Sequence, residues 1–154
     1  MKTKLAVLGL LLLGGCAGLD PAPQCDMGLI ASQRELVPGP AMVPGWSSPL
    51  KEMPMNSVSI TETTLLHKLH VRAIDARRTG TGTVEVLAQV VNCTDFPQNA
   101  EARTQFFDDT QVPSEPASAW AHLHLPPHTT VTYQELSIGA KSVEGYMIEM
   151  RETK

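Results

Sequence analysis

Apolar and polar residues alternate along most of the chain after Val58, with the period of two that is typical of β-strands. The clearest run is VEVLAQVVN, which places four small or branched apolar residues on one face (Val84, Val86, Ala88 and Val90). The same alternation recurs in five further runs, which begin near residues 69, 99, 120, 130 and 145. In the first of these, Leu69, Val71 and Ala73 share one face and alternate with His70, Arg72 and Ile74. No long helical pattern separates these runs, so the chain predicts an antiparallel β-sandwich or barrel.

The segments between the runs have the composition of turns. RRTGTGT offers Gly80 and Gly82 for positive φ, whereas NCTDFPQ, TQVPSEPAS and PPH are rich in proline and short polar residues. In AWAHLHL the alternation places Leu123 and Leu125 toward the core, opposite Trp120 and two histidines. The stretch from Thr110 to Trp120 and the edge strands are the candidate contact surfaces. For Trp120 itself the favoured position is the core, with a contact role as the alternative.

The pattern changes at the N-terminus, where Lys2 and Lys4 precede nine apolar or glycine residues, Leu5 to Leu13. A membrane-spanning helix needs about 20 apolar residues, so this run has the length of a signal-peptide core. Leu13-Gly14-Gly15-Cys16 resembles the bacterial lipobox, which predicts cleavage before Cys16 and covalent diacylglycerol and N-acyl lipid on that residue. The alternative is an ordinary signal peptide with an unrelated cysteine nearby. Because Ala17 rather than Asp follows Cys16, we expect an outer-membrane anchor that faces the periplasm.

Residues 16–57 are rich in proline, which removes amide donors and opposes a continuous sheet or a long helix. We therefore divide the chain into a signal peptide (1–15), a lipidated proline-rich tether (16–57) and a β-domain (58–154). Within the tether, GLIASQREL has helical spacing, with Ser32 and Glu35 as a capping pair and Pro38 as the end. This short helix is expected to dock on the domain, with binding to a partner as the alternative.

The charge composition of the chain excludes some classes of binding partner. Without the leader the chain has ten basic and sixteen acidic residues, which excludes nucleic acid and attraction to an anionic surface. Cys25 and Cys93 remain as an even pair in an oxidising compartment. They predict either a disulfide or two unpaired thiols.

Two segments, VVNCTDFPQNAEARTQFFDD and SAWAHLHLPP, resemble the YcfL-like family of small Gram-negative periplasmic lipoproteins. The resemblance runs from about Leu65 to Glu152 and rests on nine matching positions: Asn92, Thr94, Arg103, Phe106, Phe107, Asp108, Trp120, Leu125 and Pro126. Phe106 departs from the tryptophan that the family often has, and Asp109-Thr110 replaces its usual turn glycine. The resemblance implies an all-β fold, a small antiparallel immunoglobulin-like β-sandwich, and implies no catalytic activity.

One group of residues could bind a metal ion: HLHLPPH contains His122, His124 and His128, and imidazole is a common metal ligand. Alternation places the first two on one strand face about 7 Å apart at Cα, a spacing that suits zinc or copper. Met53 and Met55 would add soft thioethers for Cu(I). The favoured interpretation is a solvated strand face, so no metal or other cofactor is expected.

Catalytic patterns are weak throughout. Asp108 and Asp109 are adjacent and should point to opposite faces, which favours a turn over an acid–base pair. Ser137 and Ser142 lack a G-x-S-x-G context, and Arg103 is expected to pair with Asp108 or a neighbouring strand. We expect a non-enzymatic lipoprotein that binds another periplasmic or envelope protein as an accessory or assembly factor. A secretion-system accessory lipoprotein and a metal- or ligand-binding protein remain as alternatives.

Overall fold

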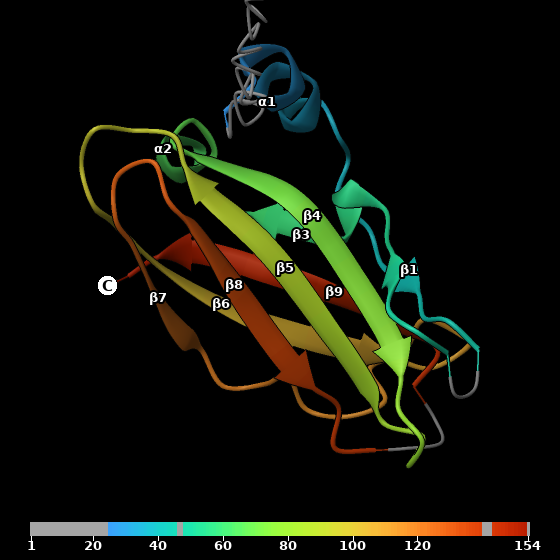
Figure 1. Cartoon of the computed structure of the whole chain (residues 1–154). Helices are drawn as coiled ribbons and strands as arrows, with labels where there is room; N and C mark the ends of the chain where they lie inside the picture. The colour runs from blue at the N-terminus through green and yellow to red at the C-terminus, as the bar shows by residue number, and fades with distance from the viewer. Residues whose placement is uncertain (1–24, 46–47, 140–142, 154) are drawn as a thin grey trace, which may run out of the picture.

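The computed structural model describes residues 25–45, 48–139 and 143–153 (Figure 1). The predicted leader, Cys16 and the chain up to residue 24 lie outside the described residues.

Two β-sheets pack face to face, which confirms the predicted antiparallel β-sandwich. Sheet A has the order β1-β9-β6-β7. Strand β3 pairs in parallel with β9, on the same edge of β9 that pairs with β1. Sheet B has the order β2-β4-β5-β8 and is antiparallel throughout. The strands of sheet A are β1 (Ala41–Met42), β3 (Val58–Ile60), β6 (Gln98–Phe107), β7 (Ala121–Leu125) and β9 (Gly145–Glu152). Those of sheet B are β2 (Lys51–Glu52), β4 (Leu69–Arg78), β5 (Val84–Asn92) and β8 (Thr130–Leu136).

Three short helical elements complete the fold: α1 (Met27–Arg34), a 3₁₀ turn (Met55–Ser57) and α2 (Thr63–Leu66). Figure 1 shows α1 and α2 at one end of sheet B and the β4–β5 turn at the other end. We call the first the helix end and the second the loop end.

The core lies between the two sheets, and the faces predicted from alternation are confirmed. In β5 the four residues predicted to share a face are all fully buried, and so are the inward residues of β9 (Tyr146, Ile148 and Met150). Leu125 in β7 is fully buried, whereas His122 and His124 on the opposite face of that strand are exposed. Burial of one face of each strand supplies the hydrophobic free energy that holds the sheets together.

One predicted face is wrong. Alternation through Leu69 and Val71 places Ala73 in the core, but the pairing with β5 shifts between Val71 and Ala73. This β-bulge reverses the phase, so that Ile74 and Ala76 are buried instead. A bulge inserts one extra residue into one strand of a pair. The alternation of residues within a single strand does not reveal where such an insertion occurs.

The start of α1 also differs from the prediction. The helix begins after Asp26, whose carboxylate accepts hydrogen bonds from the N–H groups of Gly28 and Leu29 at 2.7 and 3.2 Å. Ser32 lies inside the helix and donates its hydroxyl to the Gly28 carbonyl, so it caps nothing. In addition, β1 and β2 lie within the range assigned to the tether, and both pair with the sheets.

Both tyrosines of the chain are buried, and burial gives a measurable prediction. Tyr133 lies 3.0 Å from the Thr104 hydroxyl, and Tyr146 accepts a hydrogen bond from Ser57 at 3.3 Å. Burial raises the pKa of Tyr133, and it raises the pKa of Tyr146 to about 12.

We expect the folded chain to show less tyrosinate absorbance at pH 10.5 than the chain in guanidinium, which ionises near pH 10. Because the neutral phenols are favoured in the fold, stability should fall as the pH rises from about 10 towards 12. The measurement is absorbance at 295 nm with circular dichroism in parallel. Ionisation near pH 10 with the fold intact would contradict the burial of these hydroxyls.

Candidate functional site

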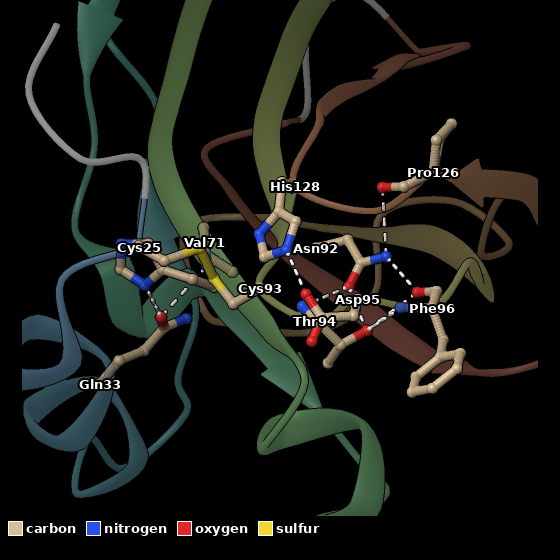
Figure 2. The surroundings of a disulfide bond; sticks show 11 residues. Cys25, Gln33, Val71, Asn92, Cys93, Thr94, Asp95, Phe96, Pro126 and His128 are labelled. Carbon is tan, nitrogen blue, oxygen red and sulfur yellow. Dashed lines mark hydrogen bonds and ion pairs between the residues drawn. A yellow bond between two sulfur atoms is a disulfide. The ribbon is translucent and has the colours of Figure 1, made fainter.

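A disulfide joins Cys25 to Cys93, with 5.8 Å between their Cα atoms (Figure 2). Cys93 directly follows β5, and its backbone N–H donates to the Lys68 carbonyl at 2.9 Å. The first described residue is therefore fixed to the helix end of sheet B. Of the two alternatives left open for this pair, the structure contains the bridge.

Helix α1 is docked on the domain beside this disulfide. Ile30 is its one buried apolar residue. The Gln33 amide oxygen accepts a hydrogen bond from Nδ1 of His70 at 2.8 Å and another from the Val71 N–H at 3.1 Å (Figure 2). A polar side chain thus ties the helix to the first residues of β4. A hollow of about 190 Å³ remains between α1 and β4, with Leu29, Leu36 and Met55 in its lining.

His70 makes this contact sensitive to pH. Burial lowers the pKa of the His70 imidazole; Asp26 acts against this shift, and Arg72 reinforces it. Because the neutral ring is favoured in the fold, its contribution to stability is complete above about pH 6.5 and is lost as the pH falls below that value.

We expect the urea midpoint of the parent chain to decrease between pH 7.5 and 5.5, and His70→Gln to reduce that decrease. Urea unfolding followed by circular dichroism at both pH values measures the two midpoints. His67→Gln is the matched control, since His67 is exposed. An equal decrease in urea midpoint for the parent and His70→Gln would contradict the role of His70 in this pH dependence.

The turn after β5 is built around Asn92, a fully buried residue. Its side-chain amide donates to the carbonyls of Phe96 and Pro126 at 2.8 and 3.1 Å (Figure 2). It also donates to the Leu125 carbonyl at 3.0 Å. Its oxygen accepts from the N–H and hydroxyl of Thr94 at 2.9 and 2.8 Å. One side chain therefore connects this turn to the end of β7.

The three candidate metal ligands have separate partners. Nδ1 of His124 lies 2.8 Å from Asn99, His122 lies 3.4 Å from Glu101, and Nε2 of His128 lies 2.8 Å from Asp95. His122 and His124 do share the outer face of β7, as alternation predicts. Within the described parts of the chain, no three His, Cys, Asp or Glu side chains are grouped so that they could hold a metal ion.

Trp120 is not in the core, which corrects the prediction. It is half-buried beside the outer face of sheet A, where the guanidinium carbons of Arg103 and Arg151 lie 4.5 and 3.8 Å from its ring centroid. Arg103 pairs with Glu149 at 2.7 Å, and Arg151 pairs with Glu101 at 2.7 Å. Of the two partners expected for Arg103, the neighbouring strand is correct.

The segment after β6 is held in shape by its own carboxylates. Asp108 accepts hydrogen bonds from the N–H and hydroxyl of Thr110 and from the N–H of Val112, which confirms that it shapes a turn. These bonds, led by the Thr110 hydroxyl, lower the pKa of Asp108.

Glu115 then connects this segment to the residues after β8. Its carboxylate accepts the N–H of Ile138 at 3.0 Å and the N–H of Gly139 at 2.7 Å. The Gln105 amide donates to the Glu115 carbonyl at 2.7 Å and fixes the same residue from sheet A. We call the two connected segments, 108–118 and 137–139, the loop pair.

The loop pair presents apolar side chains to solvent at the loop end. Val112 is 55% exposed and Ile138 is 84% exposed. Nothing in the local sequence indicated Glu115, because a carboxylate in a proline-marked loop has no distinctive pattern. The outward position of Arg151 follows from its alternation with Met150, although its contact with Trp120 does not.

None of the helices in the described part of the chain has the length and apolar character needed to cross a membrane. No family model matches this sequence, and no curated protein matches it either. Two solved structures are similar in fold. Campylobacter jejuni cj0090 has 13% identity and a TM-score of 0.48, with 63% of this chain and 98% of that chain covered. A DUF1425 family member from Shewanella sp. pv-4 has 16% identity and a TM-score of 0.45, with 53% and 80% covered.

Proposed function

We propose that the chain is a periplasmic lipoprotein that is anchored in the outer membrane through Cys16 and related to the YcfL-like family. In this proposal it is a non-enzymatic accessory or assembly factor that binds another cell-envelope protein through the loop pair. The observation that carries the proposal is the pair of exposed apolar side chains, Val112 and Ile138, on segments that Glu115 holds together.

Exposed apolar side chains alone are common on monomeric proteins and need no explanation. Those of the loop pair lie on backbone that is already ordered by Asp108, Gln105 and Glu115. A preorganised surface loses less conformational entropy on association than a flexible loop does. The geometry therefore favours a protein-binding surface over a loop that only connects strands.

The anchor itself is tested at Cys16. Cys16→Ser is expected to abolish incorporation of labelled palmitate and to move the chain from the membrane to the soluble fraction. One acyl chain holds a protein only reversibly and two or more hold it stably, so the change should be nearly complete. Unchanged labelling and fractionation would refute the anchor.

The binding surface is tested by a photo-crosslinking amino acid placed at Ile138 in the full chain in cells. The matched control is Val37, which is 81% exposed against 84% for Ile138 and follows α1 at the helix end. We expect one envelope protein to be crosslinked from position 138 and not from position 37. The same adduct should weaken when Glu115→Ala separates the two segments.

An identical set of abundant porins and lipoproteins from both positions would remove support for a specific partner. An inner-membrane secretion component as the adduct would favour the secretion-system alternative instead. Zinc or copper binding is tested separately by isothermal titration of the purified chain. No heat at micromolar protein would end that alternative.

A further inference from the structure

The disulfide limits how far the domain can stand from a lipid on Cys16. Cys25 comes nine residues after Cys16, and nine residues span at most about 32 Å whatever their conformation. Without the bridge and the docking of α1, the first point of attachment to a sheet would be Ala41, twenty-five residues after Cys16. The bridge therefore keeps the helix end, rather than the loop end, near the lipid.

The helix end carries large apolar side chains that the described residues leave exposed. Met27 and Leu29 on α1 are 68% and 59% exposed, and Phe96 in the turn after β5 is 72% exposed. The Phe96 carbonyl accepts hydrogen bonds from Asn92 and Thr94 at 2.8 and 2.9 Å, so the turn is fixed. Figure 2 shows the Phe96 ring projecting away from the network that holds its backbone.

Two acidic groups near these side chains, Asp26 and Asp95, have partners. The Asp26 carboxylate accepts two N–H groups of α1, and Asp95 lies 2.8 Å from Nε2 of His128. The chain as a whole is negatively charged, so attraction to an anionic surface is excluded. What remains is apolar insertion into a surface without net charge, for which aromatic and aliphatic side chains are suited.

We infer that the helix end docks on a zwitterionic phospholipid surface through Met27, Leu29 and Phe96, and that the loop pair points away from it. This inference rests on the proposed lipid anchor. It adds an orientation: the disulfide end lies at the membrane, and the partner-binding loops face the periplasm.

The test uses the full acylated chain in vesicles of phosphatidylcholine and phosphatidylethanolamine that contain nitroxide-labelled lipid. Phe96→Trp reports the helix end, and Ile138→Trp is the matched control at the loop end. The parent chain supplies the background of its two native tryptophans. We expect the extra emission of Phe96→Trp to be quenched by the labelled lipid and that of Ile138→Trp to be unchanged.

Two outcomes would overturn the inference: no quenching at position 96 in an acylated, vesicle-bound chain, or equal quenching at both positions. Met27→Trp is a second probe if Phe96→Trp does not fold, and it should also be quenched. The mass of the intact chain reports acylation in the same samples. A chain that lacks the acyl mass and does not float with vesicles refutes the anchor, and the docking with it, whereas a floating chain with an unquenched probe refutes the docking alone.

Discussion

Replacement of Cys25 and Cys93 by serine is expected to lower the free energy of unfolding by about 4 kcal/mol. The bridge closes a loop with a sequence separation of 68 residues. Loop closure on this scale removes conformational entropy from the unfolded chain and stabilises the fold by about 4 kcal/mol. Besides the bridge, α1 is held by the burial of Ile30 and by the hydrogen bonds of Gln33 to His70 and Val71.

Guanidinium unfolding of the parent and the double variant, followed by circular dichroism, measures this change. Reductant should shift the parent towards the variant and should leave the variant unchanged. A difference below about 1 kcal/mol would show that the bridge contributes little and that α1 is held mainly by Gln33.

Asn92→Ala is expected to lower the free energy of unfolding by about 3 kcal/mol. The substitution removes the donor for three carbonyls and the acceptor for Thr94 within a fully buried site. Buried polar groups that lose their partners carry a desolvation penalty of about 1–3 kcal/mol each, partly relieved by water. The turn after β5 and the end of β7 should loosen together.

Asn99→Ala is the control, since Asn99 is exposed and its side-chain oxygen lies 2.8 Å from Nδ1 of the exposed His124. A surface substitution of this kind should change stability by less than about 0.5 kcal/mol. Asn92→Asp keeps the acceptor for Thr94 but directs a carboxylate at three carbonyls, and it should also be strongly destabilising. Stability equal to the parent for either Asn92 variant would contradict the role of this network.

The antiparallel sandwich and the inward faces of its strands could be predicted because they depend on local periodicity. Val84, Val86 and Ala88 occupy the core since a strand places every second residue on one side, whatever its neighbours are. The same reasoning placed His122 and His124 on the outer face of β7, where the structure has them. The turns were identified for a related reason, because glycine, proline and short polar residues act within a few positions of the chain.

The features that depend on contacts between distant segments required the tertiary structure. The bulge after Val71 arises from pairing with β5. The start of α1 is different, because Asp26 caps N–H groups only two and three residues ahead and is a local signal that the capping pair of Ser32 and Glu35 displaced in the prediction. Trp120 contacts both Arg103 and Arg151 because β6 and β9 are neighbours in sheet A.

The features of the candidate sites also separate into those predicted from sequence and those set by the fold. Sequence alone determined the lipobox-like segment at Cys16, the even pair of cysteines that remains without it, and the strand faces other than the second half of β4, because each is a pattern of adjacent or evenly spaced residues. Only the fold joined Cys25 to Cys93 and Glu115 to Ile138. Those pairs lie 68 and 23 residues apart along the chain, and no local periodicity specifies which distant groups meet.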